Sequence, residues 1–238
     1  MCARITLTTT SAEIADLFGL GHDLALQPRF NMAPSQPIPV LRNNPRGGRE
    51  LVMMRWGLIP YWNSDPKHAG FVNARAETAP EKPAFRDAFR LRRGIVPVDG
   101  FYEWRQRGKV KQPFLFRKAG GGLLALAAVW DRWVTPGGGI DTVAVLTTPA
   151  NDLIRPLHDR MPAILPPDRF EAWLDPREQR PDRLLALLRP YPAELMESWA
   201  VSDRVNSASV DEPGLAEPVT LIDPPRATWG QPTLFDVA

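Results

Sequence analysis

The chain has 238 residues and a formal net charge of +2, with 44% hydrophobic and 24% charged residues. This length is enough for one domain with a substantial core, and no apolar run approaches the roughly twenty residues of a membrane helix. The single cysteine excludes an internal disulfide framework, and three scattered histidines make a poor zinc-ligand set. We therefore expect a globular protein without a metal, a cofactor or a membrane role. Because its start lacks a secretory signal, we expect it in the cytoplasm.

Charge is distributed unevenly along the chain. Residues 1–118 carry 19 Lys and Arg against 10 Asp and Glu, whereas residues 119–238 carry 10 against 17. If the basic half forms one face, it offers the positive surface that a phosphate backbone requires. The alternative is that these charges only solvate the surface. The asymmetry therefore permits nucleic-acid binding without demanding it.

The first local patterns predict a helix followed by an extended segment. Thr10 and Glu13 have capping-box spacing, and Gly19 or Gly21 provides the end of this helix. Three prolines then exclude a helix over residues 30–42 and favour the start or the edge of a strand.

The remaining patterns predict an α+β fold. Further helices are expected over residues 82–90, 166–174 and 180–188, the second with Asp168 and Glu171 in capping-box spacing. Strand-length apolar runs separated by Gly, Pro and charged turns favour mostly antiparallel sheets, and they cover residues 50–60, 92–104, 113–118, 123–130 and 141–148. We expect one domain over residues 1–225 and a flexible tail over residues 226–238, where Pro and acidic residues become frequent.

Cys2 suggests chemistry of its own. Removal of Met1 would leave a cysteine with a free α-amine, and this 1,2-aminothiol can condense with an aldehyde to an imine and then close a thiazolidine ring. The reference pKa values, about 7.7–8.0 for the amine and about 8.5 for the thiol, leave reactive fractions near neutrality, so no large pKa shift is required. The alternative is that Cys2 fills space in the core, as lone cysteines usually do.

Polar residues in three further segments could support such chemistry. His158 suits proton transfer at neutral pH, although a lone histidine is more often structural, and Asn151 could cap the helix that holds it. Glu103 shares one side of an apolar strand with an aromatic residue, which fits either an edge position or acid/base work. Asn73, Arg75 and Glu77 occupy alternate positions and would form a polar wall on one side of an extended segment. The candidate residues are therefore Asn73, Arg75, Glu77, Glu103 and His158, with Asn151 as the cap of the helix that holds His158.

Aromatic and basic residues are interleaved between residues 55 and 68. Trp56, Tyr61 and Trp62 accompany Arg55 and Lys67 in this segment. Bases can stack on such rings while cations meet phosphates, which is the usual physics of single-strand binding. The alternative is that the tryptophans fill a core, and Trp56 is assigned there.

Taken together, these segments resemble the SRAP family of SOS-response-associated peptidase-like proteins. The resemblance covers most of the chain and rests on motifs in the family's order, namely MCARI, FNMAP, RWGLIPYW, FVNARAET, VPVDGFYEW, VLTTPAN, HDRMP and VSDRVN. It implies a compact α+β domain with curved, mostly antiparallel sheets, flanking helices and a basic DNA channel that ends at the N-terminal cysteine. Family members crosslink abasic sites in single-stranded DNA and are credited with removing their own leading residue.

The resemblance also assigns roles to individual residues. It makes Cys2 the nucleophile, Asn73 the residue that holds its amino group, Glu103 the proton-transfer group and His158 the group that assists opening of the deoxyribose. The residues that it places against DNA are Arg4, Asn31, Pro34, Trp62, Arg75, Thr147 and Arg160, with arginines on phosphates and Trp62 against bases. The implied partner is single-stranded DNA with abasic sites, bound by a monomer associated with the nucleoid.

Two features depart from the family or lie outside it. Ala3 and Ile5 stand where the family usually has glycine and an aromatic residue, and Ala3 would matter if the backbone there needs a positive φ. The tail contains Gln231, Leu234 and Phe235 in a Q-x-x-L-F arrangement, which resembles peptides that bind the bacterial sliding clamp.

Two other functions stay open at this point. In the first, mature Cys2 attacks an amide with its own α-amine as the base, as in an N-terminal-cysteine amidohydrolase or protease. In the second, the protein only binds single-stranded or damaged DNA, and Cys2 is buried and inert.

Overall fold

The computed structural model describes residues 2–21, 25–44, 47–65, 67–108, 110–135 and 137–221. The five-stranded sheet has the order β12–β8–β7–β1–β2, and every pairing in it is antiparallel. Its strands are β1 (Ile5–Leu7), β2 (Arg29–Met32), β7 (Gly100–Arg107), β8 (Val110–Lys118) and β12 (Met196–Ala200).

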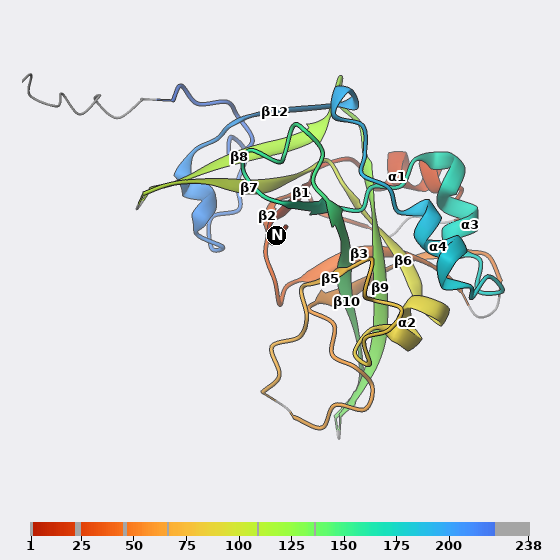
Figure 1. Ribbon diagram of the computed structural model, residues 1–238. Helices are drawn as coiled ribbons and strands as arrows, with labels where there is room; N and C mark the ends of the chain where they lie inside the picture. Colours follow the sequence, from red (N-terminus) through yellow and green to blue (C-terminus); the bar gives the residue numbers. More distant parts are fainter. Residues whose placement is uncertain are drawn as a thin grey trace, which may run out of the picture.

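The second sheet closes on itself. It runs β10–β4–β3–β6–β9, and β9 also pairs with β10, so these strands form a ring; Figure 1 shows the long strands β9 and β10 crossing the molecule together. Its strands are β3 (Pro37–Asn43), β4 (Arg49–Trp56), β5 (Asn73–Arg75), β6 (Arg93–Val98), β9 (Leu124–Thr135), β10 (Gly138–Pro149) and β11 (Arg160–Pro162). The end of β10 pairs with β5 on one side and β11 on the other, and only the β10–β4 and β10–β5 pairings are parallel among the described strands. The expected α+β fold with mostly antiparallel sheets is confirmed.

The α-helices lie together on one side of the molecule (Figure 1). They are α1 (Ser11–Phe18), α2 (Arg86–Leu91), α3 (Phe170–Leu174) and α4 (Pro181–Leu187). The short 3-10 turns are η1 (Pro167–Arg169), η2 (Ala193–Leu195) and η3 (Asp203–Asn206). In α1 both hydrogen bonds of the Thr10–Glu13 capping box form, and Gly19 ends the helix with a left-handed φ of 64°. None of the helices in the described part of the chain reaches the length and hydropathy of a membrane-spanning segment.

Two local expectations need correction. The Asp168–Glu171 capping box does not form, because the segment begins as a 3-10 turn after Pro166, and Glu171 forms an ion pair with Arg49 instead.

The proline-rich strand begins at Pro37 as expected, but it lies inside the sheet between β4 and β6. The prolines are tolerated there because β3 meets β6 only at the Leu41–Ile95 pair, so the proline-bearing half is paired with β4 alone.

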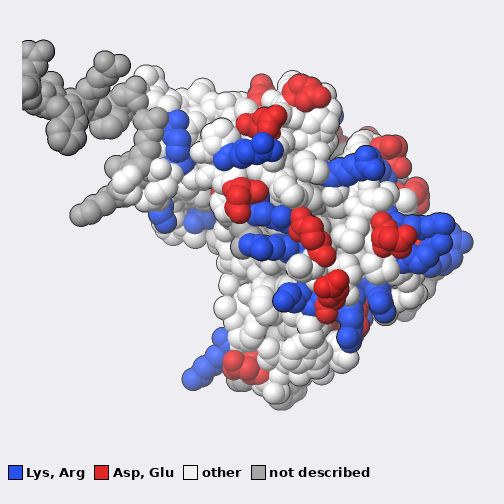
Figure 2. Space-filling model, in the orientation of Figure 1, with Lys and Arg blue, Asp and Glu red and all other residues white. Residues whose placement is uncertain are grey.

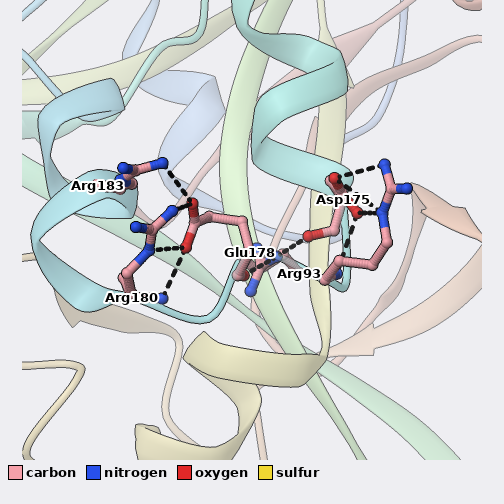
Figure 3. Close-up of polar contacts among 6 residues, drawn as sticks. Arg93, Asp175, Glu178, Arg180 and Arg183 are labelled. Carbon is pink, nitrogen blue, oxygen red and sulfur yellow. Dashed lines mark hydrogen bonds and ion pairs between the residues drawn. The ribbon is translucent and has the colours of Figure 1, made fainter.

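Arg93 joins two helix ends to the closed sheet. It lies on β6 with 5% of its surface exposed, and Trp173 of α3 packs beside it. All of its N–H groups donate to backbone carbonyls, namely those of Phe89 (2.9 Å), Arg90, Trp173 (2.6 Å), Asp175 (2.6 Å) and Glu178 (2.9 Å). Figure 3 shows the Asp175 and Glu178 side chains pointing away from Arg93, toward other arginines. Burial lowers the pKa of Arg93 to about 10, so it remains a cation at neutral pH where carbonyls of α2 and α3 converge.

We expect Arg93→Met to lower the free energy of unfolding by about 3–5 kcal/mol, because it leaves buried carbonyls without donors. Urea denaturation followed by circular dichroism measures the change. Arg177→Met is the matched control, since Arg177 is 88% exposed and pairs with Asp175 from outside. Equal stability of the two variants would show that Arg93 has no such structural role.

Candidate functional site around Cys2

The first residues run antiparallel to β7 and enter the space between the two sheets. Tyr102 N donates to Arg4 O at 3.0 Å, and Ile5 pairs with Phe101. This register brings Cys2 alongside the residues that follow Tyr102, and Cys2 is only 1% exposed. Figure 1 marks the N-terminus beside β1 and β2, near the middle of the view. Ala3 needs no positive φ, because Ser35 is the one non-glycine residue with positive φ in the described ranges.

Asn73 holds Cys2 from the other sheet. It lies at the start of β5, where it pairs with Val145 of β10, and its Nδ2 donates to the carbonyl oxygen of Cys2 at 2.7 Å. The contact therefore goes to the carbonyl, whereas the resemblance assigns Asn73 to the amino group of the same residue. Asn73 Oδ1 is buried and accepts no hydrogen bond from the residues that the structure describes. This oxygen is thus an available acceptor beside Cys2.

Glu103 is a buried carboxyl group near the cysteine. It lies on β7 with 3% of its surface exposed, on the side of the strand that Phe101 buries in the main core with Cys2. Burial raises the pKa of Glu103, and the positive charge that His158 carries when protonated acts in the opposite direction without cancelling the effect. The strand is buried on both sides here, so the edge position considered from the sequence does not apply.

The fold imposes a large pKa shift on the Cys2 thiol, although its expected reactivity required none. Burial raises its pKa well above the ordinary value, and the charge of Glu103 raises it further, while a backbone hydrogen bond from Arg4 lowers it. With Met1 still in the chain, the thiol is therefore protonated at neutral pH. A base must remove its proton before the sulfur can act as a nucleophile.

His158 is fixed by local hydrogen bonds. The turn before it is capped by Asn151, whose Oδ1 accepts from Ile154 N at 3.1 Å, as expected for a capping residue. Nδ1 of His158 accepts from Arg160 N at 2.9 Å and also lies 2.9 Å from Asp159 Oδ1. These contacts require opposite protonation states of Nδ1. We favour the backbone contact, because Asp159 is 79% exposed and free to reorient, and it leaves Nε2 as the N–H donor of a neutral ring.

Arg160 is held by a carboxylate at the edge of the site. Its two terminal nitrogens form a bidentate pair with Glu77 at 2.9 and 2.8 Å, and one of them also donates to Thr147 O at 2.5 Å. Burial alone would raise the pKa of Glu77, but hydrogen bonds from Arg160 and the charges of Arg160 and Arg75 lower it overall. The sequence places Glu77 on a polar wall, but no sequence pattern indicates its pairing with Arg160.

The expected wall of Asn73, Arg75 and Glu77 survives, although the strand itself is shorter than expected. β5 ends at Arg75 because the chain turns there, and Ala79 N donates to Arg75 O at 2.9 Å. The intervening alanines are buried while Arg75 and Glu77 are exposed, whereas the Asn73 side chain is directed at the buried Cys2.

Arg4 and Asn31 are bound to the protein itself. Arg4 donates to Asn31 Oδ1 at 2.8 Å and to the carbonyls of Val205 and Asn206. Asn31 is fully buried, and its Nδ2 donates to the carbonyls of Val205, Ser207 and Val210. These two side chains hold η3 against β2, whereas the resemblance places both against DNA.

The remaining expected contact residues differ in exposure. Thr147 is fully buried and meets Arg160, and Pro34 is partly buried. Trp62 is 55% exposed and Tyr61 53%, whereas Trp56 is fully buried, as expected. Gln231, Leu234 and Phe235 lie outside the described residues.

The basic half of the chain does not form a separate face in the view of Figure 2, where Lys and Arg stand beside Asp and Glu. Ion pairs between the two halves of the sequence explain this pattern, and they join Arg29 to Asp211, Arg42 to Asp141, Arg49 to Glu171, Arg92 to Asp131 and Arg117 to Glu197. Part of the excess positive charge of residues 1–118 is thus neutralised by carboxylates of residues 119–238.

Comparison with known proteins adds the family. The family described as "SOS response associated peptidase (SRAP)" matches residues 1–208. The chain belongs to the SRAP family. Its SRAP relatives include the abasic site processing protein YoqW of Bacillus subtilis (strain 168), which is 40% identical over 91% of this chain and 99% of its own length. The abasic site processing protein HMCES of Gallus gallus is 33% identical over 82% of this chain and 67% of its own length.

Solved structures share this SRAP fold. A crystal structure of a protein from Bacteroides thetaiotaomicron has a TM-score of 0.82 and 26% identity, and the match covers 92% of this chain and all of that one. A second, from Bordetella bronchiseptica, has a TM-score of 0.74 and 29% identity over 84% of this chain and all of that one.

The buried Glu103 predicts how stability depends on pH. Because burial raises its pKa, the folded state binds the Glu103 proton more tightly than the unfolded state does. The stabilisation that this proton gives the folded state is lost as the pH rises through the folded-state pKa. Glu103→Gln removes this loss, so the melting temperature of the variant relative to wild type should increase from pH 4 to pH 8. Thermal unfolding across this range tests it, with Glu171→Gln, 88% exposed, as the control for removing one carboxylate. A difference that shrinks as pH rises would contradict the prediction.

Proposed function

We propose that this protein captures abasic sites in single-stranded DNA covalently, through a thiazolidine formed on Cys2 after Met1 has been removed. One observation carries the proposal, namely that three groups act on one another at Cys2. Asn73 holds the Cys2 carbonyl oxygen, the charge of Glu103 acts on the Cys2 thiol, and the charge of His158 acts on Glu103. The printed names of the relatives as abasic site processing proteins support it.

The bond-forming steps balance as follows. The free α-amine of Cys2 adds to the aldehyde carbon of the opened deoxyribose, and the resulting carbinolamine takes up one proton and loses water to give an iminium ion. The sulfur then adds to the iminium carbon as its thiol proton leaves to a base, and the nitrogen of the five-membered ring keeps its own proton. Neither an oxidant nor a metal is required.

Glu103 suits both proton transfers because its pKa is raised. In its protonated form it donates to the departing hydroxyl of the carbinolamine, and the carboxylate that remains accepts the thiol proton. This second step provides the base that the buried thiol of Cys2 requires. Nε2–H of His158 donates a hydrogen bond to the ring oxygen of the sugar and so assists its opening to the aldehyde.

The surrounding residues supply the DNA contacts. Arg75 is exposed beside Asn73, and Arg160 presents a fork that already binds one oxyanion, the Glu77 carboxylate. Phosphate has the same bidentate geometry, so a DNA phosphate can replace or join that carboxylate. Trp62 stacks on or wedges between bases, and an abasic nucleotide has no base to unstack, which lowers the cost of entry. Binding then places the aldehyde at an effective concentration that can reach about 10⁵ M.

Denaturing electrophoresis tests this chemistry. Protein mixed with single-stranded DNA carrying one abasic site should give a band that survives denaturant and disappears with Cys2→Ala. An uncleavable residue placed before Cys2 should abolish the band, and Glu103→Ala and His158→Ala should each slow its formation by about 10²-fold or more. Normal rates in both variants would refute their assigned roles, and a band formed while mass spectrometry still finds Met1 would refute the chemistry.

The same experiment separates the two other functions. A non-covalent DNA-binding protein would keep every DNA interaction in Cys2→Ala. An N-terminal-cysteine amidohydrolase would turn over peptides or amides, whereas DNA capture is stoichiometric.

We further infer that the protein removes its own Met1. Mass spectrometry of the recombinant Glu103→Ala variant should then find more retained Met1 than in wild type, and equal removal of Met1 in both would reject self-processing through Glu103.

The tail supports a second proposal. The sliding clamp delivers this protein, as a monomer, to replicating DNA of the nucleoid during the SOS response. Gln231, Leu234 and Phe235 have the spacing of a clamp-binding peptide, with the last two as apolar contacts. Leu234→Ala/Phe235→Ala should reduce clamp retention in a pull-down by at least about 10-fold, since each buried apolar side chain contributes roughly 1.5–3 kcal/mol. Unchanged retention, or none with wild type, would end this proposal.

A further inference from the structure

The segment that carries the exposed aromatic residues is closed at its base. We call residues 58–71 the aromatic loop; residue 66 is not described. Leu58 and Phe71 exchange two backbone hydrogen bonds at 2.9 and 2.8 Å. Gly57 and Gly70 pack so closely that a Cβ on Gly70 would lie 2.3 Å from Gly57 O, so a side chain there would separate the two ends.

Arg55 braces this base from β4. Its Nη1 donates to Gly57 O and its Nη2 to Ala69 O, both at 3.1 Å. The guanidinium therefore joins the two ends of the aromatic loop. Arg55 was considered from the sequence as a cation for phosphates, but these bonds give it a structural role.

The aromatic loop is also tied to the β9–β10 hairpin along its first half. Ile59 N donates to Thr142 Oγ1 at 2.9 Å, and Tyr61 N donates to Asp131 Oδ2 at 3.1 Å. Trp133 Nε1 donates to Asn63 O at 2.8 Å. These bonds fall on alternate residues of the loop and bracket Trp62, whose own side chain stays exposed.

Asp131 is itself fixed. It is 5% exposed, pairs with Arg92 at 3.2 Å, and accepts from Arg132 N at 2.8 Å. A buried carboxylate with these partners is a rigid acceptor. It transmits the position of β9 to the backbone of Tyr61.

We propose that Asp131 and Trp133 are positioning residues that hold the aromatic loop in the shape in which Tyr61 and Trp62 receive bases. This rests on the single-stranded DNA binding proposed above and adds what prepares that surface. A mobile loop would lose conformational freedom when DNA binds, and this cost weakens affinity. Bonds already made to the hairpin remove that cost before binding.

A matched pair of tryptophan variants tests the proposal. Trp133→Phe removes the bond to Asn63 O and keeps an aromatic ring, while Trp199→Phe removes an equivalent indole bond, to Ala216 O at 2.8 Å, in the other sheet. Binding of an undamaged fluorescent single strand is measured by anisotropy on a Cys2→Ala background, so the result does not depend on crosslinking. We expect Trp133→Phe to raise Kd about 3- to 10-fold, as for the loss of one hydrogen bond, and Trp199→Phe to leave it unchanged.

A kinetic readout distinguishes positioning from catalysis. With Cys2 intact, Trp133→Phe should raise the DNA concentration for half-maximal crosslinking by the same factor and leave the maximal rate unchanged. Asp131→Asn should act in the same direction, with Asp141→Asn as its control, because Asp141 pairs with Arg42 and Arg132. These second variants decide the question if Trp133→Phe folds poorly.

Three outcomes would overturn the proposal. Equal Kd values for Trp133→Phe and Trp199→Phe, with Trp62→Ala still weakening binding, would reject the positioning role and keep the stacking surface. Unchanged binding by Trp62→Ala would reject the stacking surface and the positioning role together. A fall in the maximal crosslinking rate at unchanged half-saturation would assign Trp133 to the chemistry, against this proposal.

Discussion

The hydrogen bond from Asn73 Nδ2 to the Cys2 carbonyl connects the two sheets where the chain begins. Cys2 precedes β1 of the five-stranded sheet, whereas Asn73 opens β5, which is paired with β10 of the closed sheet. The position of Cys2 therefore depends on both sheets at once. Because the amine and the thiol of an N-terminal cysteine belong to one residue, fixing its backbone fixes both nucleophiles. Rotation about χ1 is the main freedom left to the sulfur.

Burial has two consequences at this position. It raises the pKa of the Cys2 thiol and that of Glu103, so both groups hold their protons at higher pH than they would in water. A protonated thiol reacts poorly with oxidants and stray electrophiles. On the proposed mechanism, Glu103 can accept the thiol proton only after it has given its own to the departing water. The order of amine first and sulfur second then follows from the protonation states.

Sequence patterns predicted most of the local features, the Asp168–Glu171 capping box excepted, and missed the long-range ones. The Thr10–Glu13 cap, the Asn151 cap and the alternation through Asn73 and Arg75 depend on neighbouring residues, and they were correctly predicted. The Glu77–Arg160 pair joins residues 83 positions apart, and Arg93 meets carbonyls up to 85 positions away. No periodic pattern in the sequence indicates either contact.

The same limit explains why the site was found only in part. Cys2, Glu103 and His158 were identified as chemical types, and the family motifs placed them together. Their electrostatic coupling, however, needs the register of β7 against the first residues, which no local pattern specifies. The sequence left Cys2 as either a reactive residue or one that fills the core, and the rise of its pKa follows from a burial that only the fold specifies.

The pairing of charges between the halves of the sequence constrains how DNA can be attracted. Arginines at 42, 49 and 92 are bound to carboxylates of the C-terminal half, so they contribute little net field. The positive field that would attract DNA from a distance is therefore weak, and the net charge of the chain is only +2. On the proposed function, DNA recognition rests on a few cations, with Arg75 exposed and Arg160 already holding the Glu77 carboxylate. A short list of phosphate contacts would give weak binding to undamaged strands, and the proposed covalent step would then supply the stability of the complex.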